Sequence, residues 1–451
     1  MRPSSTLPAA PAHVAVPWSM EEMVCRRAAF VAALGDHAAL VYGAPHALRN
    51  GDSEYRYRQG SDLYYLTGWE DPESAALFRP GADQPFVLFV QPKDPEREVW
   101  TGRRPGVEGA RERFGADAAF PIRELPQRLG DLCQGYPTLH YAFGEDGARD
   151  ATVFAALRGP ARVAERNGLC VPRSLVDVRS TVAELRLRKS PAELDRLRWA
   201  AAITVEAHLA AMRRGRPGIT EYEVEAEVDY TFRRRGGNGP GYTTIVGGGV
   251  NATILHYVSN EAPLRDGDLC LVDAGCEFQY YTADVTRTWP VNGRFSGAQR
   301  ELYEVVLAAH RAGIAAARPG GLFRGVHEAA LLVLVQGMVD LELLDGDVHE
   351  LISEEAYKPW FMHGTSHWLG LDVHDPGAYF SGLRSRPLEP GHVITVEPGL
   401  YLPHDDPRVP EALRGIGIRI EDDVVVTEDA PVVLTAACPT AIVEVEAACG
   451  R

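Results

Sequence analysis

The alternation of apolar and polar residues divides the chain into two regions. In the first, the short apolar runs AALVYG, SAALF, FVLFV and LHYAF alternate with helical or polar stretches up to about residue 170. Ser19 and Glu22 form a capping-box pattern that predicts a helix over MEEMVCRRAAFVAAL. This alternation is typical of an α/β domain, which we assign to residues 19–187. Residues 1–18, rich in proline and small side chains, are expected to form a disordered tail.

In the second region, residues 188–451, one order of elements occurs twice. Capping boxes predict three helix starts, at Ser190 with Glu193, Thr220 with Glu223, and Ser296 with Gln299. The first two helices, to about 214 and about 235, precede the strand-like stretches DLCLVDAG and YYTADVTRTWPV. The third, with a further helix over about 324–343, precedes GHVITVEPGLY and GIGIRIEDDVVVT. The order predicts an α+β domain made by internal duplication, with coincidence as the alternative.

Composition and charge narrow the possible functions. The net charge of −16 argues against binding to nucleic acid or to anionic membranes. No apolar stretch approaches the length of a membrane span, and the N-terminus lacks the apolar core of a secretory signal. The seven cysteines are scattered and odd in number, which indicates reduced thiols. We therefore expect a cytoplasmic protein.

Acidic residues stand at the ends of strands in both halves of the second region. If the chain turns near Phe278 and Gln279, Asp273 and Asp284 lie roughly opposite each other on neighbouring strands. In the other half, Glu397 shares a strand face with Thr395, and Glu421 shares one with Arg419. Four unrelated surface acids would explain the pattern. If instead the halves face each other, four carboxylates converge, and two divalent cations such as manganese, magnesium or cobalt would compensate their charge.

Three histidines fall within the fourteen residues MHGTSHWLGLDVHD, at positions 363, 367 and 374. The spacing of four between His363 and His367 suggests a zinc-binding helix. However, the segment contains Gly364 and Gly370, which are poor helix residues, and it lacks the glutamate of the zinc motif. Local pattern alone leaves the roles of the three histidines open.

Longer motifs resemble one known family. VDAGCE, ADVTRTWPVNG, MHGTSHWLGLDVHD, TVEPGLY and RGIGIRIEDD are similar to the motifs of the Xaa-Pro aminopeptidases, or aminopeptidase P, a family with the pita-bread metallopeptidase fold. The similarity runs from about residue 52 to about residue 427. It implies a catalytic pita-bread domain with an internal pseudo-twofold repeat, preceded by the N-terminal α/β domain of this family.

The resemblance implies a role for each matching residue. The family's five metal ligands match Asp273, Asp284, His367, Glu397 and Glu421. Two divalent ions, most often manganese in this family, would activate a bridging hydroxide that attacks the N-terminal Xaa-Pro bond. Glu397 would also act as general base or proton shuttle. His256, His363 and His374 would bind the substrate or the tetrahedral intermediate, so that only His367 of the fourteen-residue motif is a ligand.

For three further residues, two interpretations of their role are possible. Arg419 is expected to pair with a ligand carboxylate, or to form a plain surface ion pair. Trp100 matches a family tryptophan expected near the active site of a neighbouring subunit, but core packing would explain it equally well. Arg384 would bind a peptide carboxylate, or lie on a solvated loop. The family also suggests a homodimer or homotetramer.

The resemblance leaves several functions to compare. The substrate would be a peptide with proline in second position. A prolidase, which accepts only Xaa-Pro dipeptides, is the nearest alternative, and the overall match favours the aminopeptidase. Methionine aminopeptidase fits poorly because of the large N-terminal domain. A non-catalytic pita-bread binding module and a metal-free creatinase-like hydrolase are disfavoured, because all five ligand positions are filled.

Overall fold

The computed structural model describes residues 19–450, apart from the side chains of 160–165, and the tail expected over residues 1–18 lies outside this range. By its internal contacts the described chain separates into two units, one ending at Arg186 and the other beginning at Leu187. Each unit is described by itself.

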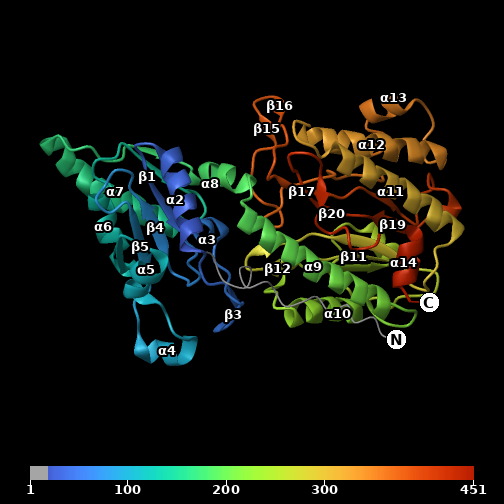
Figure 1. Cartoon of the computed structure of the whole chain (residues 1–451), viewed down its shortest axis with the longest axis horizontal. Coiled ribbons are helices and arrows are strands. Elements are labelled where there is room, and N and C mark those ends of the chain that lie inside the picture. Colours follow the sequence, from blue (N-terminus) through green and yellow to red (C-terminus); the bar gives the residue numbers. More distant parts are fainter. Residues whose placement is uncertain (1–18, 451) are drawn as a thin grey trace. The chain divides into compact units, whose positions relative to one another are not determined.

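The N-terminal unit is built on one six-stranded sheet (Figure 1). Its order is β6-β5-β4-β1-β7-β8, with β4 antiparallel to both its neighbours and the remaining pairs parallel. The strands are β1 (Ala38–Tyr42), β4 (Ala75–Phe78), β5 (Phe86–Val90), β6 (Ala118–Pro121), β7 (Thr138–Tyr141) and β8 (Ser174–Val176), with a separate ribbon of β2 (Leu48–Asn50) and β3 (Ser53–Glu54). The apolar runs predicted as strands thus form the central strands, where β4 and β5 are buried throughout.

Helices flank this sheet. They are α2 (Met20–Leu34), α3 (Ser61–Thr67), α4 (Pro95–Thr101), α5 (Gly106–Phe114), α6 (Leu125–Leu132), α7 (Gly147–Asn167) and α8 (Val178–Leu187), with a 3₁₀ turn at Ile122–Glu124. The hydroxyl of Ser19 accepts the Glu22 amide at 3.2 Å, so α2 starts where the sequence predicts. Helix α4 differs from the others described in this unit, because none of its residues is buried.

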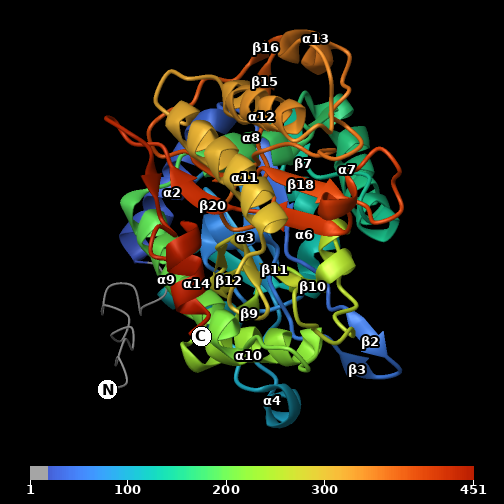
Figure 2. The ribbon, with the colours of Figure 1, turned by 90° about the vertical axis from the view of Figure 1, so that its right-hand side faces the viewer.

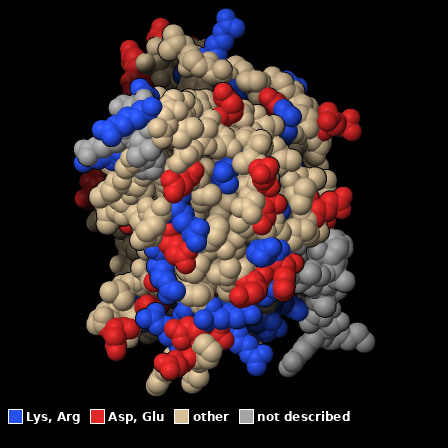
Figure 3. Space-filling model, turned by 90° about the vertical axis from the view of Figure 1, so that its left-hand side faces the viewer, with Lys and Arg blue, Asp and Glu red and all other residues tan. Residues whose placement is uncertain are grey.

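Charged side chains of both signs are mixed at the surface. On the face shown in Figure 3, acidic and basic residues lie interspersed and crowd together at the lower end. In the N-terminal unit, a hollow is lined by four cations and four carboxylates: Lys93, Arg103, Arg104, Arg113, Glu70, Asp71, Glu98 and Glu112. These charges largely compensate one another. No helix of the described residues is long and apolar enough to cross a membrane.

The C-terminal unit contains two pairs of long helices. They are α9 (Pro191–Arg214) with α10 (Glu221–Arg234), and α11 (Gly297–Ala316) with α12 (Phe323–Asp340); α13 (Val348–Ser353) and α14 (Ile442–Ala448) are short. The three predicted capping boxes are confirmed, at the starts of α9, α10 and α11. Helices α9 and α11 end just before the two Arg-Pro-Gly triplets at 216–218 and 318–320.

Antiparallel strands follow each helix pair. The first set comprises β9 (Gly239–Pro240), β10 (Ile245–Gly248), β11 (Leu269–Asp273), β12 (Cys276–Phe278), β13 (Tyr281–Thr282) and β14 (Thr286–Pro290). The second comprises β15 (Phe380–Ser381), β16 (Arg384–Ser385), β17 (Val393–Val396), β18 (Gly399–Leu402), β19 (Ile416–Arg419), β20 (Asp422–Val425) and β21 (Val432–Val433), and 3₁₀ turns cover Gly249–Thr253 and Glu411–Leu413. Figures 1 and 2 both show strands between the two helix pairs. Two similar halves therefore face each other across one core.

One detail of the predicted hairpin is wrong. The residues with positive φ at its tip are Gln279 and Tyr280, one position beyond the expected turn. Asp273 consequently pairs with Thr286, and Asp284 is its diagonal neighbour rather than its direct partner. Because the two positions are offset by two residues, both carboxylates still project from the same face of the sheet.

Candidate metal centre

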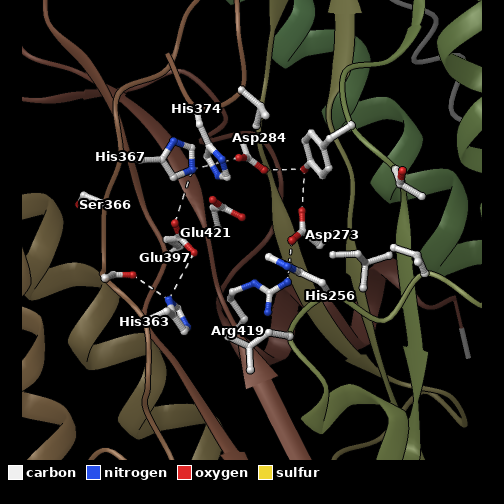
Figure 4. A pocket seen from close by; sticks show the side chains of 17 residues that line it. His256, Asp273, Asp284, His363, Ser366, His367, His374, Glu397, Arg419 and Glu421 are labelled. Atoms are coloured by element: carbon white, nitrogen blue, oxygen red, sulfur yellow. Dashed lines mark hydrogen bonds and ion pairs between the residues drawn. The ribbon is translucent and has the colours of Figure 1, made fainter. Parts of the chain in front are cut away.

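A cavity of about 560 Å³ opens between the two halves of the C-terminal unit (Figure 4). Nine residues singled out in the sequence line it: His256, Asp273, Asp284, His363, His367, His374, Glu397, Arg419 and Glu421. Arg384 lies outside it on the exposed strand β16, and Trp100 belongs to α4 of the N-terminal unit. The sequence therefore identifies most of the cavity wall, but nothing in the structure places Arg384 or Trp100 there.

The four acids occupy strand ends. Asp273 is the last residue of β11, and Glu397 directly follows β17. Asp284 precedes β14, while Glu421 lies between β19 and β20. Strand ends leave the backbone free to turn, so each half can aim its carboxylates into the space between the halves.

His367 directs its Nε2 atom toward the acids, because its Nδ1 atom is hydrogen-bonded elsewhere. Its Nδ1 lies 3.0 Å from the carbonyl oxygen of Trp368, which can only accept, so Nδ1 carries the hydrogen. Nε2 points into the cluster, 3.3 Å from Asp284 Oδ2 and 3.5 Å from Glu397 Oε1. One ligand atom each from Asp284, His367 and Glu421 lies within 4.8 Å of the others, an arrangement that could hold a metal ion.

The other histidines have different environments. His363 donates from Nδ1 to the Gly364 carbonyl at 2.7 Å, and its Nε2 lies 2.8 Å from the Tyr401 hydroxyl. His374 is exposed, and its ring contacts that of His367 edge-on with centroids 4.4 Å apart. His256 is exposed on the loop after β10. All three side chains line the cavity.

Arg419 supplies the cavity's basic side chain. Its guanidinium lies 2.6 Å from Asp273 Oδ2 and also donates to the Tyr401 hydroxyl at 3.0 Å. This ion pair fixes one oxygen of Asp273, while the other oxygen lies 2.6 Å from the Tyr242 hydroxyl. Arg419 balances only one of the four negative charges that the carboxylates carry when ionised.

Tyr242 is a site residue that the sequence reasoning missed. Its hydroxyl lies 2.6 Å from Asp273 Oδ1 and 2.5 Å from Asp284 Oδ1. Burial and the nearby Asp273 and Asp284 charges raise the pKa of Tyr242 well above its usual value. A hydroxyl has one hydrogen and can donate to only one of the two acids at a time. The second close oxygen pair requires a further proton or a cation, which the tyrosine does not supply.

Two more buried acids were missed, although both lie in the quoted motif IEDD. Asp423 accepts the Asp284 amide at 3.1 Å, which holds the backbone of one proposed ligand. Asp422 pairs with the fully buried Arg287 at 2.7 Å, and Arg287 also donates to the Glu421 carbonyl at 2.6 Å. The acidic run in the sequence was a signal for these contacts, whereas Arg287 stands in a strand with no sign of its role.

The pKa values of the cluster indicate uncompensated charge. Burial, with repulsion from Asp284, raises the pKa of Glu397 to about 7, although His367 acts in the opposite direction. Burial and neighbouring carboxylates also raise the pKa of Glu421 well above its usual value. Burial alone would lower the pKa of His367, but its hydrogen bond to Asp284 and the Glu397 charge raise it to about 9. Divalent cations would relieve this repulsion, so the donor set fits hard metal ions.

Sequence profiles of known families match most of the chain. Residues 195–428 match Metallopeptidase family M24, and residues 24–140 match the aminopeptidase P N-terminal domain. The chain is 46% identical to the Xaa-Pro aminopeptidase of Escherichia coli strain K12, over 95% of this chain and 97% of that protein. It is 36% identical to Xaa-Pro aminopeptidase 3 of Mus musculus, over 92% of this chain and 81% of that protein.

Solved structures of aminopeptidase P are also similar to this chain. The structure of Pseudomonas aeruginosa aminopeptidase PepP matches with a TM-score of 0.93 and 44% identity, and covers 96% of this chain and 98% of that chain. A structure of Escherichia coli aminopeptidase P in complex with substrate matches with a TM-score of 0.91 and 46% identity, with the same coverage. The likeness thus extends over both units.

Proposed function

Because the chain belongs to metallopeptidase family M24 and carries the aminopeptidase P N-terminal domain, it is a metal-dependent exopeptidase, and we propose that it removes the first residue from peptides whose second residue is proline. Its fold is that of the family, an N-terminal α/β domain followed by a pita-bread catalytic domain. The observation that carries the proposal is the meeting of Asp273, Asp284, His367, Glu397 and Glu421 in one cavity beside three further histidines.

The five clustered side chains are proposed to hold two divalent ions. By resemblance to the family, Asp284 and Glu421 would serve both ions, and one ligand atom of each lies within 4.8 Å of one from His367. Asp273 would complete the ligands of one ion, and His367 and Glu397 would complete the ligands of the other. Once bound, such ions polarise a substrate carbonyl and lower the pKa of water. Manganese is our proposal for the metal, although a related Escherichia coli structure is zinc-substituted.

The chain's own residues supply the remaining steps. Glu397 accepts a proton from the attacking water, since its half-buried carboxylate lines the cavity between His367 and His363. His363, His374 and His256 orient the substrate and stabilise the negative charge that develops on the carbonyl oxygen. The apolar side chains of Ile245, Leu255 and Val258 line the same cavity, so they offer non-polar surface to a pyrrolidine ring. An Xaa-Pro bond has no N–H, so shape must replace a hydrogen bond in its recognition.

The competing functions are less well supported. Prolidase is not favoured, because the two bacterial relatives that are 46% and 41% identical over almost the whole chain are Xaa-Pro aminopeptidases. A non-catalytic binding module would have no need for so many buried carboxylates, which are costly to keep without cations. A metal-free hydrolase is disfavoured because it too would have to keep these carboxylates without cations to compensate their negative charge.

Assembly and location remain proposals. We propose a homodimer or homotetramer in which Trp100 of one subunit lies near the active site of another, supported by the exposure of this side chain, 88%. Arg384 is proposed to bind a peptide carboxylate, which its exposure supports. A cytoplasmic location is supported by the seven cysteines, which are all unpaired.

A panel of peptides tests the proposed reaction. With manganese present, mass spectrometry of the products should show release of one residue from Xaa-Pro-Yaa peptides. Xaa-Ala-Yaa peptides should be cut poorly and N-acetylated peptides not at all, because the free amine is expected to bind at the metal side of the cavity. Cleavage confined to Xaa-Pro dipeptides would indicate a prolidase, and full activity of a sample shown to be metal-free would refute the metal mechanism.

A further inference from the structure

A buried ion pair lies beside the loop that carries His374. Lys189 Nζ is 3.1 Å from Asp375 Oδ2, and each side chain is only 1% exposed. Neither residue lines the catalytic cavity. Desolvating two charges offsets much of their attraction, so such a pair is weak evidence for added stability and invites another explanation.

The carboxylate of Asp375 closes the turn after His367. Its Oδ1 accepts the Asp372 amide at 3.1 Å, and its own amide donates to the Trp368 carbonyl at 2.9 Å. A Cβ at Gly370 would lie 2.5 Å from Asp375 Oδ2 and 3.0 Å from Lys189 Cε, so the turn packs directly on the ion pair. The loop is therefore shaped around this carboxylate.

Lys189 is itself firmly anchored. Its amide donates to the Gly391 carbonyl at 2.9 Å, and the next residue, Ser190, is the N-cap of α9. The ammonium thus comes from backbone that is hydrogen-bonded on one side and continues into a capped helix on the other. It offers Asp375 a fixed partner rather than a mobile surface charge.

The turn connects this pair to two of the site's histidines, His367 and His374. The Trp368 carbonyl that accepts the Asp375 amide also accepts His367 Nδ1–H at 3.0 Å. His374, directly before Asp375, is exposed and contacts the edge of the His367 ring. An exposed ring has few contacts of its own to fix it, so restraint must come from its neighbours in the chain.

We propose that Lys189 and Asp375 are positioning residues that hold His374 at the rim of the catalytic cavity. The inference rests on the function proposed above for His374. The ion pair acts through the turn and does not touch the substrate. A small displacement of a substrate-binding group costs turnover steeply, because reacting atoms must be aligned within about 0.5 Å.

The test replaces both charges at once. The double variant Lys189→Met/Asp375→Asn removes the ion pair but keeps an amide oxygen for the Asp372 N–H. Replacing a buried pair as a whole is often nearly neutral for stability, so the melting temperature should change little. At saturating manganese, we expect kcat to fall about 10- to 100-fold, with KM much less affected and two metal ions still bound by elemental analysis.

The decisive comparison repeats the double replacement in the His374→Ala background. If the pair acts through His374, the replacement should lower kcat there by no more than about 2-fold, because the two changes are then not additive. A full second loss would overturn the inference while leaving the proposed function intact. No effect of His374→Ala alone would refute both the role of this histidine and the inference. Loss of metal from the double variant would also overturn it, since the pair would then act through the ligands.

A control and a second variant keep the test informative. Arg186 and Asp62 form another ion pair near the boundary, 2.7 Å long with the arginine side chain 3% exposed. Arg186→Met/Asp62→Asn should leave kcat unchanged. If the first double variant does not fold, Lys189→Arg keeps the charge and changes only length and shape. Its effect on kcat should likewise disappear in the His374→Ala background, and persistence there would overturn the proposal.

Discussion

At the scale of single residues, Glu397 is the point where metal binding and proton transfer meet. Its Oε1 lies 3.5 Å from His367 Nε2, and its Oε2 lies 3.7 Å from His363 Nδ1. The carboxylate therefore stands between the histidine proposed to bind metal and one proposed to bind substrate. A carboxylate in this place can accept a proton from a water molecule beside the metal ligands.

Replacing this carboxylate by its amide tests that position. Glu397→Gln keeps the shape of the side chain but removes its charge and basicity. We expect a folded protein whose kcat, measured on an Xaa-Pro-Yaa peptide, falls by at least about 10²- to 10⁴-fold, with weaker metal binding in addition. The exposed Glu428 lies outside the cavity, so Glu428→Gln should behave like the unchanged protein. Near-normal turnover of Glu397→Gln would assign the base to another residue.

At the scale of elements, the hairpin from β11 to β14 determines how two of the acids meet. Gly275 lies two residues beyond the end of β11, and a Cβ there would be 1.7 Å from the Ala283 carbonyl oxygen. The same Cβ would be 3.0 Å from the ring of Tyr242, which joins Asp273 to Asp284. The hairpin therefore tolerates only glycine at this position without moving its backbone.

A single added methyl group should therefore disturb the metal centre. We expect Gly275→Ala to lower the unfolding free energy by about 2–3 kcal/mol, and to weaken manganese binding, because Asp273 and Asp284 can no longer keep their spacing. Chemical denaturation and calorimetric titration would measure the two effects. Gly297→Ala is the matched control, since a Cβ there meets nothing within 4 Å. Unchanged metal affinity in Gly275→Ala would contradict this account of the hairpin.

Local patterns in the sequence explain which elements could be predicted. Capping boxes depend on residues three positions apart, so Ser190 with Glu193 and Ser296 with Gln299 correctly marked the helix starts. The acids at strand ends could also be predicted, because Asp273 and Glu397 each end a short apolar run in the sequence. Tyr242 lies among glycines in GNGPGYTT, and its role exists only because the hairpin folds beside it. Lys189 and Asp375 are 186 residues apart, and no local pattern connects them.

At the scale of the whole molecule, the buried acids make the stability of the fold depend on pH and on bound metal. In metal-free protein the folded-state pKa of Glu397, about 7, lies above its usual value of 4.5. The folded state therefore binds a proton that the unfolded state releases, and this stabilisation is lost as the pH rises from about 4.5 through 7. The pKa of His367, raised to about 9, acts in the same direction.

Metal-stripped protein should thus melt at a higher temperature at pH 5.5 than at pH 8. Manganese should raise the melting temperature more at pH 8, because cations bind ionised carboxylates and neutral imidazole. Differential scanning calorimetry with and without manganese measures both effects. Glu397→Gln, which cannot titrate at this position, should show a smaller dependence on pH without metal. A melting temperature that rises with pH in the metal-free protein would contradict the predicted sign.

Helix α4 offers the last test, which concerns assembly. None of its residues is buried, and Val99 and Trp100 are 81% and 88% exposed. Leaving so large an aromatic side chain in water forgoes a free energy of burial that contact with a second subunit would supply. If Trp100 lies near a neighbouring active site, Trp100→Ala should both shift the protein to smaller species in sedimentation velocity and lower kcat/KM. Val443, 75% exposed on α14, provides the control, and Val443→Ala should change neither quantity. A protein that is monomeric before the substitution, or one whose assembly and activity are both unaffected by Trp100→Ala, would remove this tryptophan from the proposed interface.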